Sequence, residues 1–144
     1  MFVSMEAQVS KGEPFKVLVV DDKRAWQSKL RSLLRRLMPS AEIICASNRD
    51  EMISWVMRRE HPDLITMDGN FYIQEDREHS VGPAYVSVLR QLGVKSPIIM
   101  VTNDDEAAHN GVVNGANARC SKARERMVVE FTEALKSLGL IPHG

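Results

Sequence analysis

Five residues with reactive or charged side chains each follow a short apolar run of this sequence. Asp21 and Asp22 end the first run, Asp68 ends a later one, and Thr102 and Lys122 follow two more. Clustered carboxylates without histidine or thiolate are ligands for a hard cation, which predicts Mg²⁺, with Mn²⁺ as the alternative. Such a cation and a lysine ammonium together would favour binding of a phosphoryl group, and a carboxylate such as Asp68 can accept one covalently.

These residues share a site only if parallel strands carry them to one edge of a sheet. Short apolar runs bounded by turn residues predict buried strands, and longer runs with helical periodicity predict helices. The predicted strands are 15–20, 41–46, 62–68, 98–101 and 116–120. The predicted helices are 23–38, 48–60, 83–92, 104–114 and 123–138. This alternation predicts a parallel sheet covered on both faces, with the carboxyl ends of its strands at one edge.

The polar stretch from Gly69 to Gly82 is long for a connection between a strand and a helix, which usually takes about 2–6 residues. We expect a loop here, whose acids screen the site or contact a partner. Apolar positions that we expect to face the core include Trp26, Trp55, Met57, Leu92 and Val128.

Composition and charge exclude several classes of protein. Lys+Arg and Asp+Glu both number 19, and this balance argues against a dedicated nucleic-acid binder. No run approaches the roughly 18 apolar residues of a membrane span. Two cysteines give no disulfide framework, and residues 1–14 lack a signal-peptide core, so a cytoplasmic protein is expected. We expect one domain at 15–138, between a flexible N-terminal tail (1–14) and a C-terminal tail (139–144).

The first predicted helix has a one-sided charge. It carries six basic residues and no acid: Lys23, Arg24, Lys29, Arg31, Arg35 and Arg36. Such a face is usually solvated surface, but beside a phosphoryl site it is also a sensible docking surface for a kinase.

The motifs together resemble the receiver domain of two-component response regulators, of the stand-alone, chemotaxis-regulator-like kind. The resemblance covers about residues 15–138. It rests on Val19-Val20-Asp21-Asp22, on Asp68 after Leu64-Ile65-Thr66-Met67, on Ile98 to Thr102, and on Gly115-Ala116 seven residues before Lys122. It implies a flavodoxin-like, doubly wound (βα)5 fold with strand order 2-1-3-4-5.

By resemblance, Asp68 accepts a phosphoryl group from a sensor histidine kinase or a histidine phosphotransfer protein. The implied Mg²⁺ ligands are Asp21, Asp22, Asp68 and the backbone carbonyl of Asn70. Lys122 would pair with the phosphate and Thr102 would move to hydrogen-bond it, which switches a surface read by a downstream protein. The resemblance implies a signalling domain and not an enzyme, with at most slow self-phosphorylation from small donors and self-dephosphorylation.

The chain departs from the family pattern at three positions near the site. Arg119 stands where the family has the Tyr or Phe that swings inward on activation, so we expect the readout of Thr102 to differ. Ala123 replaces the proline after Lys122, and Asn103 replaces the small residue after Thr102.

We compared three possible functions with these residues. The first is a stand-alone phosphoacceptor that acts through another protein, since only residues 139–144 follow the last helix. The alternative is a pseudo-receiver, a constitutive interaction module without phosphorylation, which Arg119 and Ala123 favour mildly and the intact site residues oppose. The third, a metal-dependent phosphatase, needs an acid two residues after the nucleophile, where this chain has Asn70.

Overall fold

A parallel five-stranded sheet forms the centre of the protein. The structure is a computed structural model that describes residues 14–58, 61–74 and 77–143. The strands are β1 (Lys16–Val20), β2 (Glu42–Ala46), β3 (Leu64–Asp68), β6 (Ile98–Val101) and β7 (Ala118–Cys120). Their order in the sheet, β2-β1-β3-β6-β7, is 2-1-3-4-5 when only these five strands are counted, which confirms the predicted flavodoxin-like winding. The predicted N-terminal tail lies, except for its last residue, outside the described residues.

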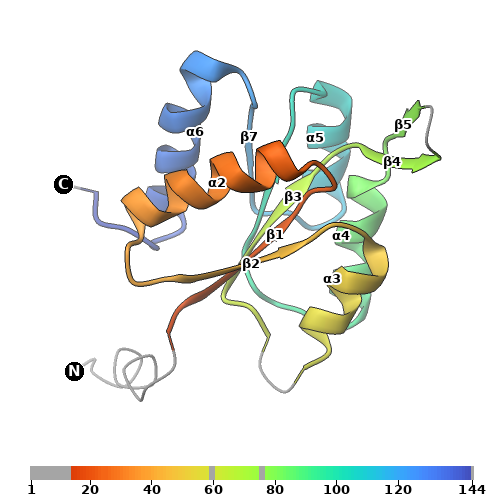
Figure 1. Ribbon diagram of the computed structural model, residues 1–144, viewed down its shortest axis with the longest axis horizontal. Coiled ribbons are helices and arrows are strands. Elements are labelled where there is room, and N and C mark those ends of the chain that lie inside the picture. Colours follow the sequence, from red (N-terminus) through yellow and green to blue (C-terminus); the bar gives the residue numbers. More distant parts are fainter. Residues whose placement is uncertain (1–13, 59–60, 75–76, 144) are drawn as a thin grey trace.

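In the described residues, five helices cover the sheet, as Figure 1 shows. One face carries α2 (Arg24–Leu37) and α6 (Arg124–Ser137), and the other carries α3 (Arg49–Val56), α4 (Gly82–Gln91) and α5 (Asp105–Val113). Among the described residues, no helix has the length and apolar character needed to cross a membrane. After α6, Leu140 and Ile141 pack against the core between the sheet and the α2–α6 face.

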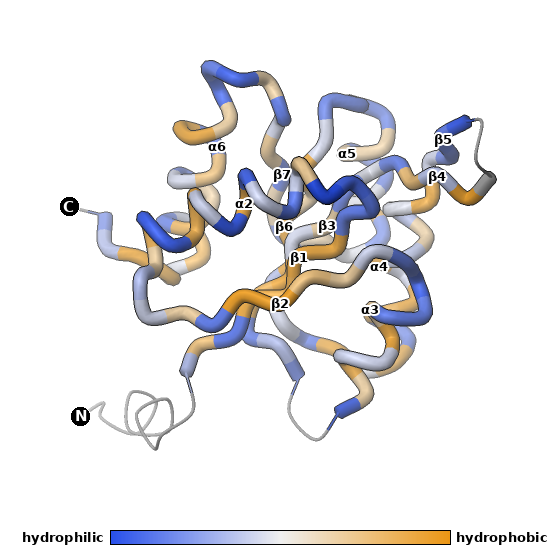
Figure 2. The backbone as a smooth tube through the Cα atoms, viewed as in Figure 1, coloured by the Kyte–Doolittle hydropathy of each residue, from blue (hydrophilic) through white to orange (hydrophobic). Residues whose placement is uncertain are grey.

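The strands are buried on both faces because their side chains alternate between two cores. In β1, Val17 and Val19 belong to the core under α2 and α6, whereas Leu18 and Val20 belong to the core under α3 and α4. Figure 2 shows the strands as the apolar centre of the molecule. Apolar residues therefore fill the strands, and polar groups collect where the strands end.

The stretch from Gly69 to Gly82 is not a loop throughout, so that prediction was wrong. It contains an antiparallel hairpin of β4 (Phe71–Gln74) and β5 (Arg77–His79), which projects beyond the end of β3 (Figure 1). Phe71 anchors the hairpin: it is 2% exposed, and its ring centroid lies 5.0 Å from that of Tyr85. Residues 75 and 76 lie outside the described residues.

Three predicted core positions are exposed instead. The exposed fractions are 59% for Met57, 39% for Leu92 and 44% for Val128. Met57 and Leu92 are the C-cap residues of α3 and α4, where the helical periodicity no longer sets the direction of the side chain. Val128 follows the buried Met127 in α6, but its side chain is open to solvent at the groove between α2 and α6. Trp26 and Trp55 are half-buried against the two cores, as predicted in outline.

Gly82 fixes the start of α4 against the end of β3. Its N–H donates to the Gly69 carbonyl at 3.0 Å. A Cβ at Gly82 would lie 2.1 Å from the carbonyl oxygen of Asp68 and 2.8 Å from the Cα of Gly69. Glycine is therefore required for the backbone to approach the last residue of β3 this closely.

We expect Gly82→Ala to lower the free energy of unfolding by about 1–3 kcal/mol, because its methyl group displaces the backbone of Asp68. The midpoint of urea denaturation measures this. Ala84→Ser, an exposed change on the same helix, should alter stability by less than about 0.5 kcal/mol. Equal midpoints for Gly82→Ala and wild type would contradict the close approach.

Candidate functional site

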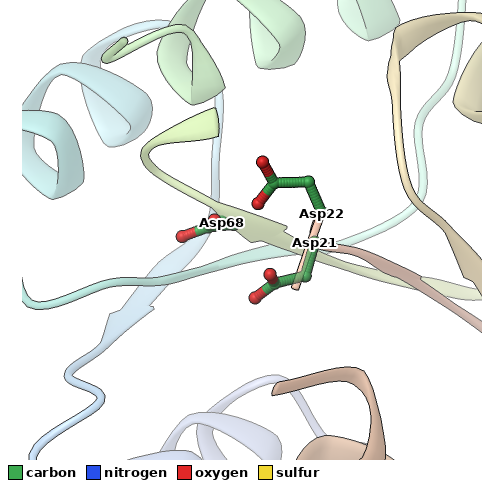
Figure 3. A group of neighbouring side chains, drawn as sticks. All are labelled: Asp21, Asp22 and Asp68. Atoms are coloured by element: carbon green, nitrogen blue, oxygen red, sulfur yellow. The ribbon is translucent and has the colours of Figure 1, made fainter. Parts of the chain in front are cut away.

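Three carboxylates meet at the carboxyl edge of the sheet. One oxygen from each of Asp21, Asp22 and Asp68 lies within 4.8 Å of the others. Asp21 and Asp22 follow β1 and Asp68 ends β3, and the two strands are hydrogen-bonded neighbours. Figure 3 shows the three side chains turned to the same side of the strand ends. The topology therefore brings together the acids that the sequence placed after separate strands.

Lys122 contacts two carboxylates of this cluster. Its Nζ lies 3.0 Å from Asp21 Oδ2 and 3.0 Å from Asp68 Oδ1. The same Nζ lies 4.7 Å from the centroid of the Trp26 ring, which covers it from the α2 side. One ammonium thus faces two buried carboxylates, and the cluster keeps a net negative charge.

Two carboxylate oxygens in the cluster accept no hydrogen bond from the described residues. Asp21 Oδ1 accepts the Lys23 N–H at 2.9 Å, and Asp22 Oδ2 accepts the Tyr72 N–H at 2.6 Å. Asp22 Oδ1 and Asp68 Oδ2 are buried without such a partner. Burying a charged oxygen without a partner is costly, and a hard divalent cation would satisfy both atoms. The donor set therefore fits Mg²⁺ or Mn²⁺.

Burial and charge shift the acidity of Asp68. Burial raises the pKa of this carboxyl from 3.8 to about 6; the charge of Asp21 adds to the rise, and Lys122 opposes it. Asp68 is therefore a carboxylate at neutral pH, but one whose charge is poorly compensated. A cation or a covalent modification that offsets the negative charge of Asp68 would therefore lower the electrostatic free energy of the cluster.

The loop after β6 connects the remaining predicted residues. Thr102 is 5% exposed, and its Oγ1 accepts the Asp104 N–H at 3.1 Å. Asp104 Oδ2 accepts from the Asn70 side chain at 3.3 Å, and Asn103 Oδ1 accepts the Lys122 N–H at 2.8 Å. This loop thus contacts both the β3 end and the lysine, although a metal-binding role for the Asn70 carbonyl stays a prediction.

A family model described as the response regulator receiver domain matches residues 17–131. The chain belongs to this family. Comparison with curated proteins gave no match.

Solved structures share the fold of this receiver. The signal receiver domain of a DNA-binding response regulator from Colwellia psychrerythraea superposes with a TM-score of 0.67 at 19% identity, over 87% of this chain and 98% of that one. A putative response regulator from Chloroflexus aurantiacus gives 0.68 at 24% identity, over 87% and 97%. The receiver domain of a Bacteroides fragilis response regulator gives 0.66 at 22% identity, over 85% and 93%. These likenesses show the fold, and the predicted absence of a nucleic-acid partner stays a prediction.

Arg119 lies apart from the carboxylates of the receiver. Its side chain is 46% exposed, and Nη2 lies 2.9 Å from Oδ1 of the exposed Asp105. Between Arg119 and Thr102 the surface has a polar cavity of about 340 Å³. The cavity is lined by Thr102, Asp105, Arg119, Ser121, Arg126 and Glu130. At the place where the family has an aromatic ring, this receiver has an ion pair and an open cavity.

Sequence reasoning missed three residues beside the cluster: Lys23, Tyr72 and Glu78. The sequence places Lys23 on the basic face of the first predicted helix and the other two in a predicted loop. Burial lowers the pKa of Lys23, but its hydrogen bond to Glu78 and the charges of Asp22 and Asp68 outweigh this and raise it. Lys23 and Glu78 are 55 positions apart in the sequence, so no local pattern predicts their contact.

We expect Asp68→Asn to stabilise the metal-free receiver at pH 7.5 by about 1–3 kcal/mol, because it removes a poorly compensated buried charge. The folded pKa of about 6 exceeds the ordinary 3.8, so wild-type stability falls as the pH rises through this window. The gain should therefore shrink toward pH 4. Urea denaturation at several pH values measures it.

The exposed Asp105→Asn is the matched control and should change stability little, since an exposed ion pair contributes about 0–1 kcal/mol. An Asp68→Asn effect that is destabilising, or constant between pH 4 and 7.5, would contradict the charge balance described for the cluster.

Proposed function

We propose that this receiver is phosphorylated on Asp68 by a sensor histidine kinase or a histidine phosphotransfer protein, in a Mg²⁺-dependent reaction that switches a protein-interaction surface. The observation that carries the proposal is the surroundings of the buried Asp68 carboxylate. One of its oxygens lies 3.0 Å from Lys122 Nζ, the other is buried without a hydrogen-bond partner among the described residues, and the side chain belongs to a cluster with Asp21 and Asp22. A cytoplasmic location is part of the proposal, because both cysteines are free thiols.

The residues divide the reaction among them. An oxygen of Asp68 attacks the phosphorus of a phosphohistidine; the P–N bond breaks, its electron pair returns to the imidazole, and an aspartyl phosphate forms. Asp21, Asp22 and Asp68 would hold the divalent cation, which offsets the negative charge of the carboxylates and the phosphoryl group. Lys122, already 3.0 Å from Asp68, would pair with a phosphoryl oxygen, and the Thr102 hydroxyl would donate a hydrogen bond to another.

Acetyl phosphate tests this directly. We expect wild-type protein with Mg²⁺ to gain one base-labile phosphate by intact mass, and to gain none when EDTA removes the cation. Asp68→Asn should remain unlabelled, whereas Asp50→Asn, an exposed change on α3, should label like wild type. Label that persists in Asp68→Asn would sink the assignment of the site. An unlabelled wild type would favour the pseudo-receiver instead.

A groove between α2 and α6 is the surface we propose for the phosphodonor protein. Its volume is about 550 Å³, and its lining includes Lys122, which also contacts Asp68. The apolar lining is Trp26, Leu33, Met127 and Val128, and the basic lining is Lys29, Arg36, Lys122 and Arg124. An acidic amphipathic helix complements such a groove, and Lys122 would guide its histidine toward Asp68.

We expect the double change Arg36→Glu and Arg124→Glu to slow phosphotransfer from the cognate kinase by about tenfold or more, because it reverses charge at the groove. Transfer from acetyl phosphate should stay within about twofold of wild type. Arg58→Glu, which changes a residue stacked on Trp55 on the other face, is the control. Equal losses with both donors would place the defect in the chemistry and not in docking.

A further inference from the structure

The β4–β5 hairpin contacts the carboxylate cluster through Asp22 and Lys23. The backbone N–H of Tyr72 donates to Asp22 Oδ2 at 2.6 Å. Glu78 Oε2 lies 2.5 Å from Lys23 Nζ, and the Tyr72 ring centroid lies 4.6 Å from the same ammonium. Because Phe71 is buried in the core, the hairpin holds these groups on a fixed support. The hairpin therefore forms one wall of the site.

Lys23 lies between two acids, Glu78 on the hairpin and Asp22 in the proposed metal site. Its Nζ is hydrogen-bonded to Glu78 and lies 3.7 Å from Asp22 Oδ1, beyond ordinary hydrogen-bond length. Asp22 Oδ1 is one of the two buried oxygens without a hydrogen bond from the described residues. The Lys23 side chain is 32% exposed, so it has room to change partner. A small movement would place its ammonium on an oxygen that a metal ion needs.

We propose that the hairpin sets the divalent-cation affinity of this receiver by holding Lys23 on Glu78 and away from Asp22 Oδ1. The inference rests on the metal site of the proposed function. Lys23 and Glu78 are positioning residues that act through Asp22. When Glu78 keeps the ammonium, Asp22 Oδ1 is available to a cation; when Glu78 lets it go, the ammonium competes for the same oxygen. The segment between Asp68 and α4 thereby tunes the site it borders.

The test is a titration of the folded full chain with Mg²⁺ by isothermal calorimetry, at constant ionic strength. We expect Glu78→Gln to weaken Mg²⁺ binding about threefold, because the released ammonium moves onto Asp22. Lys23→Met should tighten binding about threefold, because the competing cation is gone. In the Lys23→Met background, Glu78→Gln should have no further effect.

The double variant separates this mechanism from two others. If Glu78→Gln weakens binding equally with and without Lys23, then Glu78 acts by long-range charge or by loosening the hairpin, and the inference is overturned. An unchanged affinity in Glu78→Gln, or a weaker one in Lys23→Met, overturns it too. Glu42→Gln removes the same charge at the opposite edge of the sheet, at the start of β2, and should leave affinity unchanged.

Failure of the inference and failure of the proposed function give different results. Wild-type protein that binds Mg²⁺ and is labelled on Asp68, with all variants at wild-type affinity, removes the inference alone. Wild-type protein that binds no Mg²⁺ removes both.

Discussion

The under-compensated charge of three carboxylates, two of them buried, is the constraint on which the rest of this structure depends. Asp21, Asp22 and Asp68 share the carboxyl edge of the sheet. Lys122 lies 3.0 Å from two of them, and Lys23 lies 3.7 Å from the third. Two apolar cores hold the strands in place, so the acids cannot separate without disrupting the packing of the sheet. The remaining negative charge makes the site receptive to a cation and makes Asp68 responsive to any change in its surroundings.

Charge alone would not make a switch, and the loop from Thr102 to Asp104 supplies the connection. Its side chains and backbone contact the end of β3 through Asn70, the lysine through Asn103, and the start of α5 through Asp104. Gly69 leaves space for the Thr102 hydroxyl, since a Cβ there would lie 2.8 Å from it. A displacement of Thr102, as the proposed phosphorylation would require, would therefore act on α5 and on the Lys122 loop together.

The sequence predicted the sheet, and the meeting of the acids at its edge, because each strand and each acid that ends one is a local signal. Apolar runs such as β1 and β3 are buried on both faces, and the acids that end them share an edge for topological reasons. The hairpin was missed because its apolar run, Phe71 to Ile73, is only three residues long before the polar segment begins, and Phe71 alone among these three is buried. The hydrogen bond between Lys23 and Glu78 joins residues 55 positions apart, so it can be seen only in the folded structure. The predicted burial of residues at helix ends, such as Met57, was wrong because periodicity does not locate the last turn of a helix.

The ion pair and open cavity at Arg119 involve a different free energy from that of an aromatic ring at the same position. Moving an aromatic ring between solvent and a buried site involves about 2–3 kcal/mol, little affected by salt. The exposed ion pair of Arg119 and Asp105 involves about 0–1 kcal/mol and is screened over about 8 Å at physiological ionic strength. If the proposed phosphorylation switches this surface, its two states would differ by a small free energy at this position. The ionic composition of the surrounding solution would then act on the surface beside the proposed phosphorylation.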